Sequence, residues 1–376
     1  MRDSTSFNYP VEEDYFILMN KDKKVLDFKI MYGLDIKVTE TFRYLIKLPI
    51  GFTDLLSWLE SRQAPKHRVH IEKLLELCGI NNLANYLKIT YALSLNDTFW
   101  VKPQNKDLTW NKVSLYQNDF NTTIARIAFE GGLYGLEFTP TSPEFGTDGA
   151  FAKCWTKDFD SSINLLKRGS TGARNAGLET YSEFYSSQIA KLICKDYVNY
   201  DLVKFHDKLA SSCELFTSES EGYAPMHKLI DRRQPIEKLF EFYDGIGSGE
   251  DFIRMIVFDA LTINTDRHLG NHGVIFDCDT MEIKRMAPVF DNNQALLPYA
   301  EDEDFANLDE YLKMKGPRIG REFIDVAKYS LTPTIRRDLA NMRGFKFTKH
   351  KELNLDDDRL IKLENLVNSQ IDLILK

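Results

Sequence analysis

The sequence predicts an α+β protein in which a small α/β unit is followed by a strand-rich lobe and then a helix-rich lobe. Three observations support this prediction. The chain has 376 residues, more than one small domain needs. Residues 146–170 have the pattern of a β-hairpin. From Gly245 onward, long helical patterns of apolar residues dominate.

An accessory α/β domain is expected over residues 1–120. Residues 14–31 have the pattern of two short strands around the polar turn NKDKK. Residues 52–63 and 67–80 carry apolar side chains at helical spacing. No motif identifies the role of this domain, and the sequence leaves open whether it binds a partner, an inhibitor or a substrate.

The strand-rich lobe is expected over residues 121–217 and the helix-rich lobe over residues 218–376. In the first, a glycine-rich connection follows the hairpin and leads into a helix. The apolar face of that helix consists of Leu178, Tyr181, Tyr185, Ile189 and Leu192. A short apolar strand follows at residues 209–218. The last helix of the chain opens with three acidic residues, as a helix N-terminus prefers.

Composition narrows the class of protein. A net charge of −8 argues against general nucleic-acid binding, which needs a basic face. The five cysteines include no CxxC pair, so they suggest neither a zinc site nor a disulfide framework and fit a reducing compartment. The N-terminus lacks the apolar core of a signal peptide, and no segment approaches the ~18 apolar residues of a membrane span. We expect a soluble cytoplasmic protein that binds neither membrane nor nucleic acid directly.

Residues 264–277, NTDRHLGNHGVIFD, gather polar side chains before an apolar run. His268 and His272 are four apart, as in half of a zinc protease motif, but the adjacent Glu of HExxH is missing. Gly270 and Gly273 also disfavour the helix that such a motif needs. The pattern therefore argues against a dedicated zinc site.

The spacing of Asp266 and Asn271 fits phosphoryl transfer better. Protein kinases place a base Asp and a magnesium-binding Asn five residues apart. The carboxylate orients the acceptor hydroxyl, and the amide oxygen holds Mg²⁺ without adding negative charge. A tight turn at residues 277–280 predicts that the next strand returns Asp291 towards Asn271. There Asp291 would be a second oxygen ligand of the kind that Mg²⁺ prefers.

These residues resemble those of a known family. TDRHLGN followed by APVFD resembles the HipA-like serine/threonine kinases, and DRH with the later Asn is also similar to the related phosphoinositide 3- and 4-kinases. The resemblance covers about residues 130–376 and implies a bilobal, protein-kinase-like fold. It also implies roles for Lys167, on a strand, as the ligand of the ATP phosphates and for Glu183, on the following helix, as its partner. CELFT resembles the hinge between the lobes, with Glu214 and Phe216 facing adenine.

The sequence departs from the general kinase pattern at two motifs, the DFG motif and the glycine-rich loop. Residues 291–293 read DNN rather than DFG, and no GxGxxG precedes Lys167. The phosphate-covering loop is then expected at residues 139–150, where Gly146 and Gly149 would let backbone N–H groups approach phosphate. In HipA-like kinases this loop can carry a self-phosphorylated Ser. The candidates for autophosphorylation in this chain are Ser142 and Thr147.

Several alternatives stay open at this point. Lys153, on the partner strand of the hairpin, competes with Lys167, and Glu179, one helical turn before Glu183, competes with that residue. Under the kinase reading, His268 lies near the γ-phosphate and Asp266, but it could instead hydrogen-bond to its own loop. Arg267 either braces the loop or pairs with phosphate. Asp266 and Asn271 could also be ordinary turn formers.

The expected function is that of a serine/threonine protein kinase that uses ATP and Mg²⁺. The resemblance implies the toxin of a toxin–antitoxin system, which is held by a separately encoded antitoxin and is capable of autophosphorylation. The alternatives are a lipid or small-molecule kinase of phosphoinositide-kinase type, and a pseudokinase that only binds nucleotide. The sequence identifies neither the substrate nor the oligomeric state.

Overall fold

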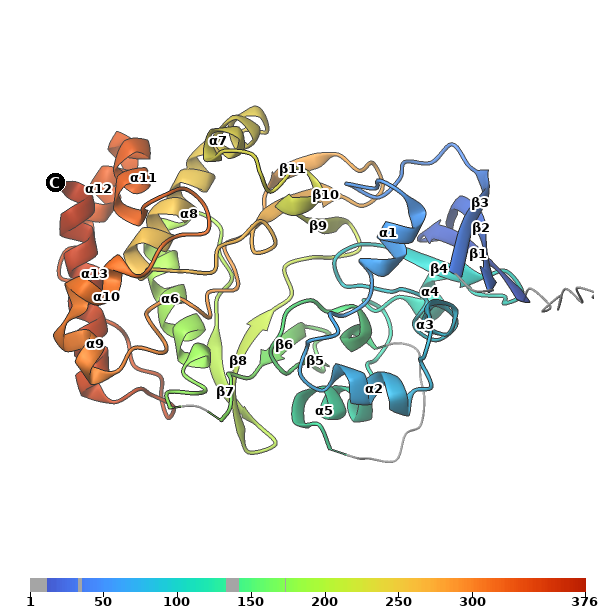
Figure 1. The fold of residues 1–376 in the computed structure, drawn as a ribbon, viewed down its shortest axis with the longest axis horizontal. Helices are drawn as coiled ribbons and strands as arrows, with labels where there is room; N and C mark the ends of the chain where they lie inside the picture. Colours follow the sequence, from blue (N-terminus) through green and yellow to red (C-terminus); the bar gives the residue numbers. More distant parts are fainter. Residues whose placement is uncertain (1–11, 33–35, 133–141, 173) are drawn as a thin grey trace, which may run out of the picture. The chain divides into compact units, whose positions relative to one another are not determined.

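The computed structural model describes residues 12–32, 36–132, 142–172 and 174–376 (Figure 1). It has the mixed α+β composition that the sequence predicts. The chain divides into two compact units. Unit 1 comprises Met1–Ala150 with Cys278–Met281, and unit 2 comprises Phe151–Asp277 with Glu282–Lys376.

Unit 1 is built on an antiparallel sheet with the strand order β3-β2-β1-β4. The strands are β1 (Glu12–Asn20), β2 (Lys23–Tyr32), β3 (Ile36–Arg43) and β4 (Phe99–Pro103). The first two confirm the strand pair expected over residues 14–31. The turn between them contains Lys21, whose φ of 50° is left-handed. A polar turn between two apolar strands is enough to specify this hairpin.

The described part of unit 1 also contains five α-helices: α1 (Leu55–Glu60), α2 (Ile71–Leu77), α3 (Leu83–Thr90), α4 (Trp110–Val113) and α5 (Thr122–Glu130). Side-chain caps fix where three of them begin. Asp54, Asn82 and Asn121 each accept a hydrogen bond from a backbone N–H in the first turn of α1, α3 and α5. The apolar faces of these helices and of the sheet form one buried core.

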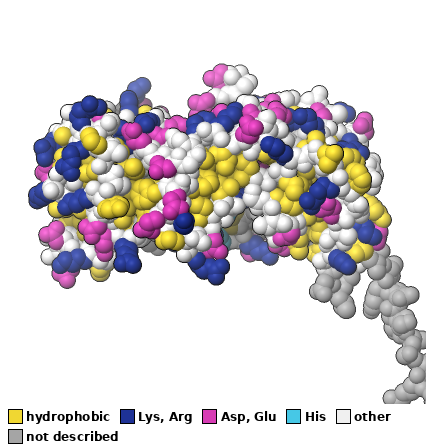
Figure 2. All heavy atoms as spheres, turned by 90° about the horizontal axis from the view of Figure 1, so that it is seen from above, with side chains coloured by type: hydrophobic (Ala, Val, Ile, Leu, Met, Phe, Trp, Pro, Cys, Tyr) yellow, Lys and Arg dark blue, Asp and Glu magenta, His cyan; other side chains and the backbone are white. Residues whose placement is uncertain are grey.

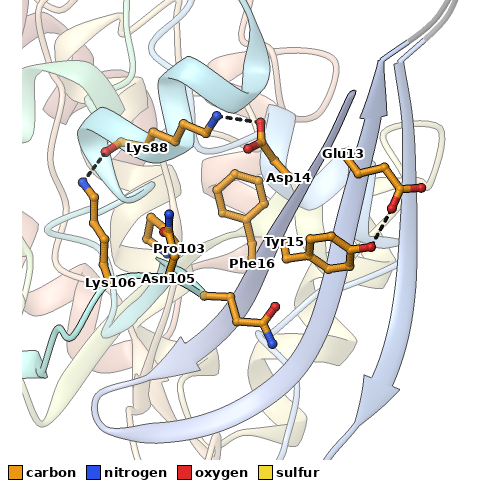
Figure 3. A pocket seen from close by; sticks show the side chains of 9 residues that line it. Glu13, Asp14, Tyr15, Phe16, Lys88, Pro103, Asn105 and Lys106 are labelled. Carbon is orange, nitrogen blue, oxygen red and sulfur yellow. Dashed lines mark hydrogen bonds and ion pairs between the residues drawn. The ribbon is translucent and has the colours of Figure 1, made fainter. Parts of the chain in front are cut away.

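A cavity of about 550 Å³ opens in unit 1, where β1 extends beyond the end of β4 (Figure 3). Its walls include both acidic and basic side chains. Asp14 on β1 pairs with Lys88 on α3 at 2.6 Å, and the Tyr15 hydroxyl donates to Glu13 Oε2 at 2.5 Å. All the residues that line it belong to unit 1. None of them is among the site residues that the sequence predicts.

Unit 2 begins with a second antiparallel sheet of strand order β5-β6-β8-β7. Its strands are β5 (Lys153–Lys157), β6 (Ile163–Lys167), β7 (Asp201–Phe205) and β8 (Lys208–Glu214). The pairing of β5 with β6 confirms the expected hairpin. Helix α6 (Glu179–Ile193) packs against β7 and β8 (Figure 1). The helix expected after the glycine-rich connection is therefore present.

A three-stranded sheet of order β11-β10-β9 joins this part to the helices. Its strands are β9 (Glu221–Pro225), β10 (Gly273–Asp277) and β11 (Ile283–Met286). The strand expected to run as far as Asp291 ends earlier. Pro288 has no N–H for a ladder bond, and Asp291 has a left-handed φ of 54°, so the chain leaves the sheet before the site is reached.

The rest of unit 2 is helical. The helices are α7 (Ile236–Gly245), α8 (Gly249–Thr262), α9 (Asp302–Ala306), α10 (Leu308–Lys313), α11 (Phe323–Ser330), α12 (Pro333–Asn341) and α13 (Asp357–Leu375). Helix α8 is the central one and contacts α6, α7, α11 and α13. Helix α13 begins where the acidic run predicts, with Asp356 accepting from the N–H of Arg359.

On the face seen in Figure 2, basic and acidic side chains are interspersed and hydrophobic side chains lie between them. Over the described ranges, each helix is too short or too polar to cross a lipid bilayer.

Candidate active site

Lys167 occupies the last position of β6, between Lys153 on β5 and Ser211 on β8. Its side chain is buried, and its Nζ forms ion pairs with Glu183 on α6 and with Asp291 Oδ1, the latter at 2.6 Å. The Ser211 hydroxyl donates to the second oxygen of Glu183. A strand, a helix and a loop far apart in sequence therefore meet at one ammonium group.

The charges of this cluster determine its protonation. Burial opposes the charge on Lys167, but Asp291 and Glu183 outweigh that effect and raise the pKa of the ammonium group. Burial also raises the pKa of Glu183, against the pull of Lys167. For Asp291, burial is outweighed by Lys167 and Lys153, and its pKa falls to about 2. Asp291 is therefore an anion at neutral pH.

Two hydrogen bonds fix the position of Asp291. The Asp291 N–H donates to the Tyr200 hydroxyl at 3.0 Å. Asn293 Nδ2 donates to Asp291 Oδ1 at 3.0 Å, the same oxygen that contacts Lys167. The residues DNN that replace the DFG motif thus form a turn in which the last Asn holds the first Asp.

Arg267 joins several segments of the site and acts as a brace between them. Its guanidinium is 1 % exposed, and its Nε lies 3.1 Å from Asp259 Oδ2 on α8. Its Nη1 donates to the carbonyl oxygens of Asn271 and Phe290, at 2.8 and 2.5 Å, and its Nη2 donates to Asn292 Oδ1 at 2.5 Å. Two oxygens bound by one nitrogen cannot lie more than ~5 Å apart. The structure thus favours the loop-brace interpretation of Arg267 over pairing with phosphate.

Asp266 and Asn271 lie on the loop between α8 and β10. Asn271 Nδ2 donates to the backbone oxygen of Asp266 at 3.0 Å, which fixes the amide and turns Oδ1 away from that bond. The Asp266 carboxylate is partly exposed, and its Oδ1 lies 2.9 Å from Nε of Arg318. The loop therefore presents one carboxylate and one amide oxygen, and through Arg267 the backbone oxygen of Asn271 lies near that of Phe290, the residue before Asp291.

The two histidines of this loop differ in environment. His268 is exposed, and its Nδ1 accepts the N–H of Gly270 at 3.0 Å, so the ring hydrogen-bonds to its own loop as one alternative anticipated. His272 is buried, and its Nδ1 lies 2.8 Å from the Tyr243 hydroxyl. Burial, with Arg267 nearby, lowers the pKa of His272 to about 3. His272 is a neutral core residue.

The two expected hinge residues lie at the end of β8. Glu214 is exposed at the last position of the strand and pairs in register with Asn164. Phe216 is partly buried in a cluster with Tyr223 and Phe290, whose rings have centroids 5.6 and 5.3 Å from its own. Phe290 directly precedes Asp291, so the aromatic cluster and the charged cluster are adjacent.

The expected phosphate-covering loop is described from Ser142, and residues 139–141 lie outside the described part of the chain. Ser142 is buried and donates to Glu144 Oε2 at 2.5 Å, and the Thr147 hydroxyl donates to the Pro143 oxygen at 2.7 Å. A Cβ on Gly146 would lie 2.8 Å from the oxygen of Leu93, so close packing explains this glycine.

Gly149, the other expected glycine, has a φ of 90° that favours glycine. This stretch packs into unit 1, whereas the Lys167 cluster belongs to unit 2.

The competing assignments of the ammonium and its partner can now be compared. Lys153 is buried opposite Lys167, and its charge acts on Asp291, but Lys167 forms the ion pair with Glu183. Glu179 is buried at the start of α6, where it accepts the Tyr299 hydroxyl at 2.7 Å. Helical spacing places both glutamates on one face, and only the ion pair distinguishes them.

Sequence analysis missed two residues that contact this site, Asp259 and Arg318. A signal for Asp259 exists, because an acidic residue in the apolar stretch of α8 predicts a buried partner. No local pattern marks Arg318, which is 52 positions from Asp266 in the numbering. Among the described residues, no group of three or more His, Cys, Asp or Glu side chains is arranged to hold a metal.

No family model and no curated protein matches this sequence. Among solved structures, the complex of the Shewanella oneidensis toxin–antitoxin proteins HipA and HipB with operator DNA contains a similar chain. The match has a TM-score of 0.51 and 12 % identity, and it covers 96 % of this chain and 99 % of that chain. A Helicobacter pylori proinflammatory kinase, CtkA, matches with a TM-score of 0.46 and 15 % identity over 59 % of this chain and 92 % of that chain.

The chain thus has the bilobal, kinase-like fold of HipA. The resemblance first seen in TDRHLGN and APVFD is confirmed at the level of the fold.

Proposed function

We propose that this protein is a kinase that uses ATP and Mg²⁺ to phosphorylate a Ser or Thr hydroxyl of a protein substrate. One observation carries the proposal. Lys167, Glu183 and Asp291 form a buried charge cluster, and the Arg267 brace holds Asn271 and the Asp266 loop beside it. The similarity of the fold to that of HipA supports the proposal.

The residues fit a magnesium ion. Mg²⁺ is usually held by one or two carboxylates together with substrate phosphates and water. Asp291 is ionised at neutral pH, and the Asn271 amide is fixed through its nitrogen, which leaves its oxygen for a cation. When bound, the ion would neutralise the negative charge of the phosphates. Two protein oxygens are a sufficient set for this role.

The roles of the remaining residues follow from their positions. Lys167, held by Glu183, binds the α- and β-phosphates, and Phe216 with Glu214 borders the adenine. Asp266 orients the acceptor hydroxyl and accepts its proton while the oxygen bonds to the γ-phosphorus. The bond from that phosphorus to the bridging oxygen breaks, and ADP leaves. Positioning and charge stabilisation supply most of the rate.

For Gly146, Gly149, Ser142, Thr147 and His268, the roles expected from the sequence remain proposals. For autophosphorylation, the Ser142 or Thr147 hydroxyl must first leave its present acceptor. A toxin role with a separately encoded antitoxin is proposed by analogy with HipA, whose solved complex contains HipB. Cytoplasmic location remains a prediction from the sequence.

The test is incubation of the purified protein with γ-labelled ATP and Mg²⁺, beside Asp266→Ala, Asp291→Ala and the exposed control Asp325→Ala. Label should appear in the wild type and the control and vanish in the two site variants. Mass spectrometry then locates the label. Nucleotide binding that depends on Asp291 but without transfer would indicate a pseudokinase or a strict external substrate. No nucleotide binding would refute the proposal.

A further inference from the structure

The segment between α10 and α11 brings a second arginine to the proposed catalytic carboxylate. Nε of Arg318 lies 2.9 Å from Oδ1 of Asp266. The two side chains are 59 % and 27 % exposed, so both remain accessible to a ligand. Arg318 forms no second ion pair within the described ranges, and its guanidinium presents five N–H donors in total.

Packing of the residues on either side holds this arginine in place. Pro317 and Ile319, on either side of it, line a small cavity together with Asp259 and Arg267. Gly320 has a φ of 81°, and a Cβ there would lie 2.9 Å from Val326 Cγ2. The backbone is thus fixed against the helices on both sides of Arg318, which presents its side chain to Asp266 instead of to the core.

Stability does not explain the arrangement. Ion pairs with this degree of exposure add little to folding, because water and salt screen them and the side chains lose freedom. An arginine whose backbone is held by packing but whose side chain is left in solvent is better explained by a ligand that binds it.

The loop that carries Asp266 has no cation of its own for such a ligand. Arg267 is committed to the brace. Nδ1 of His268 accepts a hydrogen bond from Gly270. The cation beside Asp266 therefore comes from another element, and Arg318 supplies it.

We infer that Arg318 is a catalytic residue of the reaction proposed above, on which this inference rests. Its Nε holds the Asp266 carboxylate, and its Nη groups pair with the phosphoryl group during transfer. Negative charge on the transferring group is spread over three oxygens, and a planar guanidinium matches them with two donors. Proton and phosphoryl transfer are then coordinated by one side chain that contacts both the carboxylate and the phosphoryl oxygens.

The experiment measures turnover of Mg-ATP and transfer of γ-label by the full chain. The variants are Arg318→Ala, Arg318→Lys and the control Arg321→Ala, an exposed arginine of the same segment. Arg318→Ala should lower kcat by about 100-fold, the size expected for one lost transition-state donor. The KM for ATP and the Tm should stay close to those of the wild type. Arg318→Lys should recover part of kcat, and Arg321→Ala should match the wild type.

A double-mutant cycle tests the link to the carboxylate. The loss in Arg318→Ala combined with Asp266→Ala should be much smaller than the product of the single losses, because each substitution disables the same step. An unchanged kcat in Arg318→Ala would overturn the inference and make the contact a surface ion pair. A raised kcat would also overturn it, because Arg318 would then inhibit the reaction by blocking the Asp266 carboxylate.

Failure of the inference is distinct from failure of the proposed function. If the wild type turns over and loses activity in Asp266→Ala, but Arg318→Ala equals the wild type, only the inference fails. If the wild type neither binds Mg-ATP nor transfers label, both fail together.

Discussion

Arg267 and Arg318 both lie next to Asp266, one along the chain and one in space, and their surroundings are opposite. The Arg267 guanidinium is buried and donates to the backbone and side chains of three chain segments. Arg318 is 59 % exposed and pairs with one carboxylate. The same type of side chain therefore serves two purposes. An arginine whose donors all bond within the protein stabilises the structure of the site. An arginine whose donors face solvent can bind a substrate.

Among the substitutions that test this comparison, Arg267→Met should have the largest effect, a loss of unfolding free energy. The substitution leaves Asp259 buried without its cation and frees the two carbonyl oxygens of the brace. Breaking a buried pair from one side costs about 3–5 kcal/mol of unfolding free energy. Urea unfolding followed by circular dichroism measures this loss. The double variant Asp259→Leu with Arg267→Met should be less destabilised than Arg267→Met alone, and equal destabilisation would argue against the charge explanation.

The next largest effect is on the rate of phosphoryl transfer, and it distinguishes the two lysines of the β5–β6 hairpin. Lys167→Met should lower the rate of label transfer by at least ~100-fold, equivalent to about 2.7 kcal/mol of transition-state stabilisation. Lys153→Met should cost less than ~10-fold, because Lys167 still holds Glu183 and Asp291. The measurement is single-turnover transfer at saturating Mg-ATP. A larger loss in Lys153→Met would reverse the assignment.

A smaller effect comes from pH and His272. Its pKa in the folded protein is about 3, below the ordinary value of 6.5, so the unfolded chain takes up a proton that the folded chain refuses. The free energy of unfolding contributed by this group is complete above the ordinary pKa and falls as the pH decreases towards 3. The slope is at most about 1.4 kcal/mol per pH unit. His272→Phe should flatten the decline, measured by urea unfolding between pH 6.5 and 4, and an unchanged slope would assign the decline to other groups.

The smallest effect should be that of Arg318→Ala on stability. An exposed ion pair contributes about 0–1 kcal/mol, so the unfolding free energy should change by no more than ~0.5 kcal/mol. Differential scanning calorimetry beside Arg321→Ala gives the measurement. A loss as large as that of Arg267→Met would mean that Arg318 also braces the loop, and the contrast between the two arginines would disappear.

The sequence predicted the parts of the site that depend on local spacing. Asp266 and Asn271 share one loop, and a tight hairpin is enough to return Asp291 to it. Lys167 and Glu183 were assigned from the resemblance to the HipA-like kinases, and the structure pairs them. In the Asp266 loop and the following hairpin the connections are short, so the geometry of turns and strands determines where the side chains meet.

The parts that the sequence did not predict depend on packing between distant segments. The position of Arg318 is set by how the segment before α11 packs against the Asp266 loop, and no period in the sequence encodes that. Ser142 shows the same limit. Its type and position suited a modification site, but the fold buries its hydroxyl, which donates to Glu144.

The Arg267 brace restricts which amino acids this position can hold. The site uses three nitrogens of one planar group, in fixed directions, to join α8 to the segments around Asn271 and Asn292. Lysine would keep the charge but offers a single nitrogen, which can reach only part of this set. Glutamine or histidine would lose the charge that Asp259 requires. No single replacement elsewhere restores three bonds at once, so the position is closed to gradual substitution.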